Sequence, residues 1–246
     1  MRTVVNDTNN TGAAKNLNAA SVISTTKVMK PGEDMGAAKA MKAGEDMSAA
    51  KTMKGPDKTV ERKKKQTYHL IIRGYDRKKV FGDDKDYKKF LNLLNNLMQR
   101  FDAVLYAFTL MTNHIHLLIK IADIELFTEY LTKAYTGYFY YRYKKPGRLF
   151  EPSLFYPKNS VYLKMNIIIY ILNNPALANI SQPWTYKYNS YLFYTTAYNE
   201  LTKYVKVEPN IIRKNFISLD SFKDLLRSKL VVERAEKRFK YMEDEW

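Results

Sequence analysis

The sequence predicts an α+β fold, in which helices pack on an antiparallel sheet, behind a tail that cannot form a core. All 34 aromatic residues lie within residues 66–246. A segment without aromatics buries too little apolar surface to offset the entropy lost on ordering. Beyond the tail, runs with strand and helix periodicity follow in the order strand, helix, strand, strand, helix, strand, helix.

The tail, residues 1–65, contains an internal repeat. The twelve residues 29–40 are followed by a near copy at 41–52, and a third copy begins at Met53. This period is too short for the usual solenoid units, and Met is the only large apolar residue in the repeat. We therefore expect duplicated, mostly disordered low-complexity sequence.

The first four elements are predicted from residue type and spacing. Gln66–Arg73 is rich in β-branched and aromatic residues and stops at Gly74, as a strand does. Asp83 or Asp84 can cap a helix that runs to about residue 100, with apolar residues three and four apart. Residues 103–111 and His114–Ile121 are strand-like and are separated by Thr112-Asn113, which predicts a hairpin.

The later elements follow in the same way. Ile124–Tyr143 is predicted as a long helix ending near Pro146-Gly147, and residues 149–156 as a short strand. Residues 161–173 are predicted as a helix stopped by Pro175. A Tyr-rich stretch then runs to residue 204, and residues 205–246 are expected to form a helical extension with two helices.

The first six elements match a ferredoxin-like βαββαβ layout, with two helices on one face of the sheet. This layout leaves the other face free for a site. RRM-like RNA-binding domains share it, so the fold alone does not decide the function.

Charge favours a polyanionic partner. The net charge is +16, of which residues 1–65 carry +6, leaving +10 for the rest. Such a balance suits nucleic acid or an anionic membrane surface. The absence of cysteine excludes disulfides and thiolate sites, and fits a cytosolic protein. No apolar run approaches the ~20 residues of a membrane span, and the N-terminus lacks a signal-peptide core.

His114 and His116 are the most informative local signal. Residues two apart on a strand point to the same face, with side chains about 7 Å apart, which lets two imidazoles converge on one ion. Ile115, Leu117 and Ile119 would face the opposite side. Two histidines exposed on a strand, with no ligand role, are the alternative.

Tyr170 and Asn174 form a second pair. They are one turn apart on the predicted helix 161–173 and its end, so they share a face. A phenol can attack phosphorus and a carboxamide oxygen can bind a hard cation. The pair by itself is weak evidence, because the chain has 20 tyrosines and Asn-Pro is a common helix stop.

Taken together, the two motifs resemble a known family. Thr-Asn-His-Ile-His-Leu-Leu-Ile at 112–119, followed by Tyr-Ile-Leu-Asn-Asn-Pro at 170–175, resembles the single-tyrosine HUH transposases, with the REP-associated tyrosine transposases as the closest branch. Residues 68–74, 147–150 and 190–194 resemble further elements of that family. Leu172 departs from it, because the family often has His at this position.

The resemblance implies the HUH endonuclease fold and a catalytic site. It implies metal ligation by His114, His116 and Asn174, and a Tyr170 nucleophile that cleaves and rejoins DNA through a 5′-phosphotyrosine. His69 would have a supporting role. The resemblance implies Mg²⁺ or Mn²⁺, with Zn²⁺ as the alternative suggested by the imidazole ligands.

The resemblance also implies the partners. The expected substrate is single-stranded DNA, containing a hairpin. Basic residues expected to contact it are Arg73, Arg142, Lys144, Lys145 and Arg148, and tyrosines of the helix 124–143 suit base stacking. Some relatives exchange the tyrosine helix in a homodimer, so whether Tyr170 acts in its own subunit stays open. No membrane partner is expected.

Two other functions compete with a transposase. A non-catalytic, domesticated nucleic-acid-binding module could use the same fold, but it would need stacking aromatics where the central strand has His114 and His116. A membrane-surface protein could use the basic charge, but no strongly amphipathic basic helix supports this.

Overall fold

The computed structural model describes residues 63–158, 160–196, 199–228 and 237. Nearly all of the predicted tail 1–65, with its repeats, therefore lies outside the described residues, as does most of the sequence after residue 228. No helix within the described ranges has both the length and the apolar character needed to cross a lipid bilayer.

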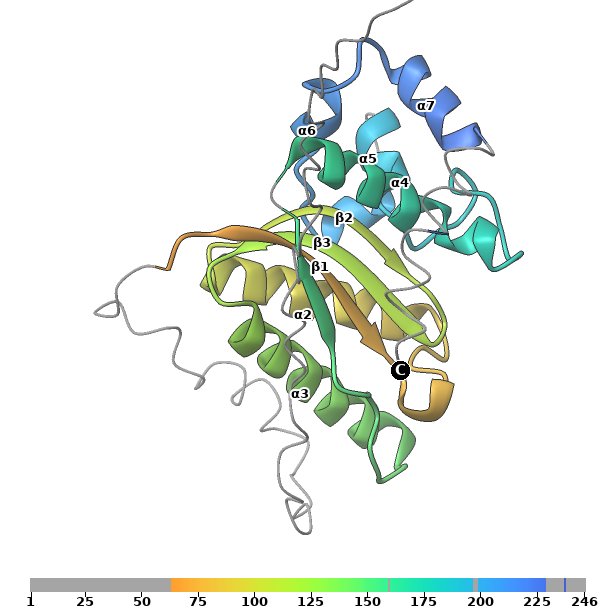
Figure 1. Ribbon diagram of the computed structural model, residues 1–246. Coiled ribbons are helices and arrows are strands. Elements are labelled where there is room, and N and C mark those ends of the chain that lie inside the picture. Colours follow the sequence, from red (N-terminus) through yellow and green to blue (C-terminus); the bar gives the residue numbers. More distant parts are fainter. Residues whose placement is uncertain (1–62, 159, 197–198, 229–236, 238–246) are drawn as a thin grey trace, which may run out of the picture.

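A four-stranded antiparallel sheet forms the centre of the molecule (Figure 1). Its strands are β1 (Gln66–Arg73), β2 (Val104–Leu110), β3 (His114–Ile121) and β4 (Leu154–Pro157), in the spatial order β2-β3-β1-β4. This order, with β1 and β3 in the middle, is that of a ferredoxin-like sheet. The predicted α+β class and βαββαβ layout are therefore confirmed.

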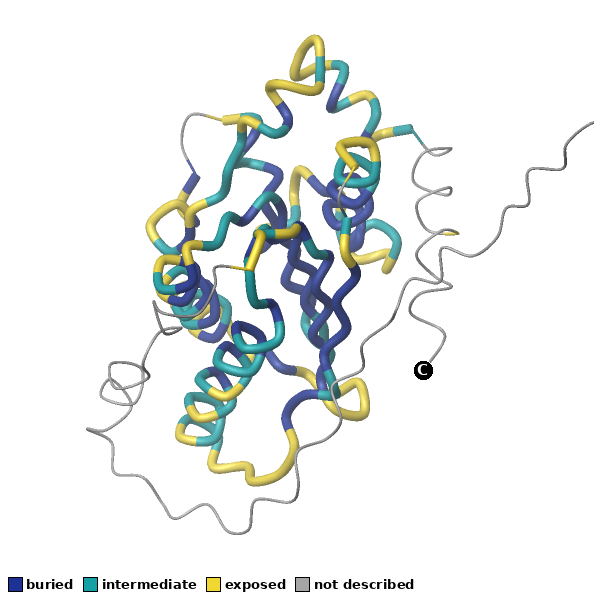
Figure 2. Tube along the Cα trace, turned by 60° about the vertical axis from the view of Figure 1, so that its left-hand side comes forward, coloured by how far each residue is buried: buried dark blue, intermediate teal, exposed yellow. Residues whose placement is uncertain are grey.

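Two helices cover one face of the sheet. These are α2 (Asp84–Arg100), which Asp83 caps as predicted, and α3 (Ile124–Tyr143). The odd-numbered residues of β3, from Ile115 to Ile121, enter the core beneath them. The strands are buried along most of their length, as Figure 2 shows. The predicted apolar face of β3 is thus the face toward α2 and α3.

The second face of the sheet is covered, which corrects the expectation that it would be free. Helix α4 (Val161–Leu177) crosses it over β2 and β3. Its apolar residues 167–172 form a second core with side chains of β2 and β3, and with the short helices α5 (Tyr191–Thr195), α6 (Asn210–Arg213) and α7 (Leu219–Arg227). A helix as apolar as α4 must be buried on most sides, so the second face gains a layer of its own.

Two predicted boundaries were wrong. The strand predicted at 149–156 is shorter: β4 begins at Leu154, and before it Phe150 forms a single bridge to Gly74. Helix α4 does not stop before Pro175 but continues to Leu177, with Pro175 inside its last turns. Two 3-10 turns, η1 (Tyr75–Arg77) and η2 (Glu200–Lys203), were not predicted.

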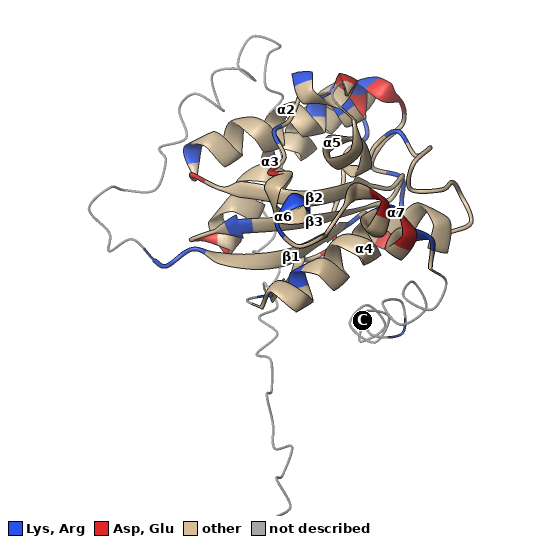
Figure 3. Ribbon diagram, turned by 90° about the horizontal axis from the view of Figure 1, so that it is seen from above, with Lys and Arg blue, Asp and Glu red and all other residues tan. Residues whose placement is uncertain are grey.

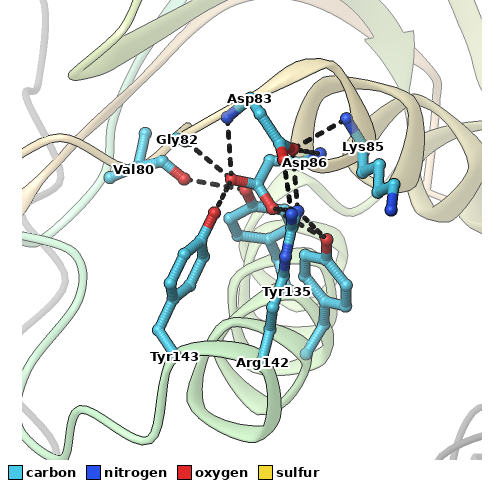
Figure 4. Close-up of polar contacts among 9 residues, drawn as sticks. Val80, Gly82, Asp83, Lys85, Asp86, Tyr135, Arg142 and Tyr143 are labelled. Carbon is cyan, nitrogen blue, oxygen red and sulfur yellow. Dashed lines mark hydrogen bonds and ion pairs between the residues drawn. The ribbon is translucent and has the colours of Figure 1, made fainter.

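A buried carboxylate joins α2 to the end of α3 (Figure 4). Asp86 is fully buried and accepts hydrogen bonds from the Gly82 backbone at 2.6 Å, the Tyr138 hydroxyl at 2.7 Å and the Tyr143 hydroxyl at 2.6 Å. Arg142 donates to the same carboxylate at 2.5 Å. A buried charge is tolerable only with such partners, and together they fix the end of α3 against the start of α2.

Acid should loosen this junction. Burial by itself raises the pKa of Asp86, but the hydrogen bond from Tyr143, those from Gly82 and Tyr138, and the charge of Arg142 outweigh it, and the pKa lies below its ordinary value of 3.8. A carboxyl with a lowered folded-state pKa stabilises the fold above its unfolded-state value and loses that stabilisation as pH falls. This contribution is therefore present at neutral pH and disappears below about pH 4.

We predict that Asp86→Asn lowers the free energy of unfolding by roughly 2–4 kcal/mol at pH 7, because it leaves the buried Arg142 contact and hydroxyl donors poorly matched. Urea unfolding followed by circular dichroism measures this. The exposed Asp76→Asn is the control and should change stability by less than about 0.5 kcal/mol. The difference between wild type and Asp86→Asn should shrink from pH 7 to pH 3, and a constant difference would contradict the role of the charge.

Candidate functional site

All three histidines of the chain meet at one place on the face of the sheet covered by α4. His69 on β1 and His116 on β3 belong to adjacent antiparallel strands, whose register pairs His69 with Leu118 and Ile71 with His116. Their side chains therefore lie on one face, two residue pairs apart along the strands. His114 shares this face two residues before His116, as predicted from the spacing.

The imidazole rings and a phenol pack into one cluster. The ring centroids of His114 and His116 are 5.0 Å apart, and those of His69 and His116 are 5.3 Å apart. The Tyr170 ring from α4 lies edge-on to both inner histidines, 5.7 Å from His116 and 6.0 Å from His69. The phenol and the paired histidines that the sequence singled out are thus brought together within a single subunit.

Both histidines of β3 are oriented by a hydrogen bond at Nδ1. His114 Nδ1 lies 2.8 Å from Asn113 Oδ1, and His116 Nδ1 lies 3.1 Å from His69 Nε2. Their Nε2 atoms are directed elsewhere: that of His114 lies 3.3 Å from Asn174 Oδ1. That of His116 is buried and has no hydrogen-bond partner among the described residues. Asn113 and His69 thus act as orienting neighbours.

Burial keeps the inner histidines neutral. Desolvation, helped by the charge of Arg73, lowers the pKa of His116 to about 3, against a smaller opposing effect of the Asn174 side chain. Desolvation, with smaller effects of His116 and Lys158, also lowers the pKa of His69 well below 6.5. Neutral imidazole is the form that binds a metal ion.

The side-chain nitrogen and oxygen atoms of the cluster suit a divalent ion, although the protein would supply few ligands. No three His, Cys, Asp or Glu side chains within the described ranges converge as a metal cluster. His114, His116 and Asn174 nevertheless offer two Nε2 atoms and one amide oxygen on one side. In protein metal sites a ligating histidine uses one ring nitrogen for the ion and the other for a neighbouring hydrogen bond, and both histidines here have Nδ1 in contact with a neighbouring side chain.

A threonine that the sequence analysis missed holds α4 over this cluster. Pro175 lacks an N–H and cannot bond to the carbonyl of Ile171, four residues earlier. The hydroxyl of Thr109, which is fully buried on β2, donates to that carbonyl at 2.6 Å. Thr109 is also the register partner of His116. The helix is thereby fixed to the sheet between Tyr170 and Asn174.

The cluster is closed on most sides. His116 is fully buried, and Tyr170 and Asn174 are only 5% and 7% exposed. His114 is half-buried, so of these residues it lies nearest to solvent. A substrate would reach the cluster from the end of the sheet at which β3 begins and β1 ends.

The predicted DNA-contacting residues have different surroundings. Arg73 is the register partner of His114 and so adjoins the cluster. The Arg142 guanidinium is engaged by Asp83 and Asp86, which gives it a structural role that the sequence did not indicate. Lys144, at the end of α3, lies over the exposed ring of Tyr141, and Lys145 and Arg148 follow in the next loop. Lys and Arg are spread over several elements, as Figure 3 shows, so net charge alone does not locate a binding surface.

Comparison with known proteins supports part of this picture. Residues 62–162 match a family model described as IS200-like transposase. The match includes all three histidines but ends before Tyr170 and Asn174. The chain is similar to a solved structure of a REP-associated tyrosine transposase bound to a REP hairpin, with 11% identity, 56% of this chain and 84% of that chain covered, and a TM-score of 0.48. No curated protein matches the chain.

We predict that Thr109→Val lowers the free energy of unfolding by about 1–3 kcal/mol, because the buried Ile171 carbonyl loses the hydroxyl that donates to it. Thr109→Ser should retain most of the stability. Pro175→Ala restores a helical N–H, so in the Thr109→Val background it should recover part of the loss. Urea unfolding of the four variants gives a double-mutant cycle, and strictly additive effects would show that the two residues do not share this carbonyl.

We also predict that Mn²⁺ binds the wild-type protein and that His114→Ala or Asn174→Ala weakens binding at least about tenfold. Isothermal titration calorimetry at pH 7 measures the affinity. Asn96→Ala, which removes an exposed amide from α2 on the opposite face of the sheet, is the control. Equal affinity in wild type and His114→Ala would place the ion elsewhere.

Proposed function

Because residues 62–162 match a family model described as IS200-like transposase, we propose that this chain cleaves and rejoins single-stranded DNA, with Tyr170 as the nucleophile. The observation that carries the proposal is the meeting of Tyr170, Asn174 and all three histidines in one cluster. These residues come from two strands and a helix that are far apart in sequence, and nothing in the packing of an ordinary core requires three imidazoles at one point.

The phenol of Tyr170 would attack the phosphorus of the scissile phosphate. A bond forms between the phenolic oxygen and phosphorus, and the bond from phosphorus to the 3′ oxygen breaks, leaving a 5′-phosphotyrosine and a 3′-hydroxyl. The phenol proton passes to water, since burial lowers the pKa of His69 and of His116 and makes both weak bases. Attack by a 3′-hydroxyl reverses the step and joins two strands without an external energy source.

His114, His116 and Asn174 would hold a divalent ion, for which we propose Mg²⁺ or Mn²⁺. Such an ion would polarise the non-bridging phosphate oxygens and offset the charge that develops during displacement. The chain itself contributes the orientation. Asn113 and His69 set the imidazole rings, and Thr109 fixes the helix that carries Tyr170.

The position of Tyr170 and of the nearby basic residues bears on the partners. Tyr170 lies against the histidines of its own chain, which favours action within one subunit over exchange in a homodimer. Arg73, adjoining His114, is the basic residue best placed to contact a phosphate next to the one attacked. A single-stranded substrate, with a hairpin beside it, fits a site that opens at one end of the sheet.

A non-catalytic nucleic-acid-binding module is the alternative. The burial of Tyr170 favours it, because a nucleophile must reach a phosphate, and here the phenol ring is packed inside the second core. The two functions differ in one product. Only the enzyme leaves DNA covalently attached to the protein.

We predict that wild type incubated with single-stranded hairpin DNA and Mn²⁺ forms a covalent adduct, seen as a shifted band on a denaturing gel. Tyr170→Phe should abolish the adduct while keeping DNA binding, because it removes only the hydroxyl. His114→Ala should reduce adduct formation at least about a hundredfold.

The matched control for that experiment is Tyr162→Phe, which alters an exposed tyrosine of the same helix and should leave the yield unchanged. An adduct that persists in Tyr170→Phe would assign the nucleophile to another residue. DNA binding without an adduct in wild type would favour the non-catalytic module.

A further inference from the structure

A basic cavity lies beside the candidate site, at the end of the sheet where β1 stops. Its volume is about 610 Å³, and it lies between η1 and the loop that follows α3. Four cationic side chains line it, Lys78, Lys79, Lys145 and Arg148, together with the aromatic rings of Tyr75 and Tyr140. No acidic residue is among the described residues that line this cavity. Its size lies within the range of small-molecule sites.

Aromatic rings position the cations of this cavity. The Tyr75 ring is 40% exposed, and the Arg148 guanidinium lies 5.0 Å and the Lys78 ammonium 5.7 Å from its centroid. Arg148 also donates from Nε to the Phe150 carbonyl at 3.0 Å, which fixes its planar group. The Tyr140 hydroxyl donates to the Gly147 carbonyl at 2.6 Å and shapes the opposite wall.

Short contacts connect the cavity to the histidine cluster. The Gly74 amide donates to the Asn113 carbonyl at 2.8 Å, and the Asn113 side chain donates to the Arg77 carbonyl at 3.3 Å. The same Asn113 side chain orients His114. The Tyr75 amide donates to the Leu149 carbonyl at 2.9 Å and ties the two walls together. The turn at Asn113 therefore lies between the cluster and η1, whose Tyr75 lines the cavity.

We propose that this cavity binds an unpaired nucleotide of the DNA strand, adjacent to the phosphate at the histidine cluster. The inference rests on the proposed action on single-stranded DNA, and it specifies where on the protein an unpaired nucleotide would bind. Lysine and arginine side chains suit the phosphate, while an aromatic ring and a planar guanidinium suit the face of a base. A strand that leaves the cluster past His114 would pass directly over η1.

Binding without chemistry tests this proposal. Fluorescence anisotropy with a single-stranded oligonucleotide, Tyr170→Phe protein and no metal ion measures affinity at several salt concentrations. Lys78→Ala/Lys79→Ala should weaken binding at least about fivefold and reduce the slope of log affinity against log salt by about 1.4, the value for two lost phosphate contacts on a single strand. The exposed pair Lys203→Ala/Lys206→Ala, which removes the same charge beside α2 and outside the lining of the cavity, should leave both quantities nearly unchanged.

Stacking gives an independent readout. Tyr75→Ala should weaken binding about fivefold or more, and Tyr75→Phe should restore it, because the ring is what contacts the base. Photo-cross-linking of an oligonucleotide containing 5-iodouracil, followed by peptide mapping, should label Tyr75 or its neighbours in η1.

The outcomes separate this inference from the proposed function. Equal losses in the two lysine pairs, or an equal loss of affinity for duplex DNA, would overturn the cavity as a nucleotide site and leave a general basic surface. Adduct formation by wild type, together with unchanged binding in Lys78→Ala/Lys79→Ala, would overturn the cavity but keep the nuclease. Selective loss in that variant, without any adduct in wild type, would keep the cavity and overturn the nuclease.

Discussion

The hydrogen bond from Thr109 to the carbonyl of Ile171 is the contact on which the arrangement of the site depends. A proline within a helix leaves one carbonyl without its usual donor, and burying that carbonyl unpaired would be costly. A hydroxyl from β2 supplies the donor at 2.6 Å. Because Thr109 lies opposite His116 in the sheet, satisfying this carbonyl also sets where Tyr170 and Asn174 stand relative to the histidines.

The two faces of the sheet differ in the side chains that they bury. The face toward α2 and α3 is an apolar core, and the buried Asp86 network secures the far end of α3 against α2. The face toward α4 mixes apolar side chains with three histidines, whose burial lowers the pKa of at least the inner two. Packing a helix over polar groups is tolerable because each imidazole finds partners in its neighbours. The buried Nε2 of His116 has no hydrogen-bond partner among the described residues, and an ion at that position would satisfy it.

The cluster, the turn at Asn113 and the basic cavity form a continuous set at one end of the sheet. Asn113 contributes to all three, through its carbonyl to Gly74, its amide to η1 and its side-chain oxygen to His114. The loop that follows α3 completes the cavity, and the Asp86 network determines where that loop begins. A few short contacts thereby link the junction of the helices to the histidine cluster.

The sequence by itself determined the order of the elements, most of their bounds, and the pairing of His114 with His116, because strand and helix periodicity depend only on neighbours along the chain. The i, i+4 relation of Tyr170 and Asn174 is local in the same sense. Only the tertiary structure decided that α4 covers the second face and that His69 contacts His116. The same holds for the ion pairs of Arg142 with Asp83 and Asp86. It also holds for Thr109, which donates to the carbonyl that Pro175 leaves without a helical partner. Each of these depends on residues distant in sequence, and a local pattern cannot say which distant partner will satisfy a buried carbonyl, imidazole or charge.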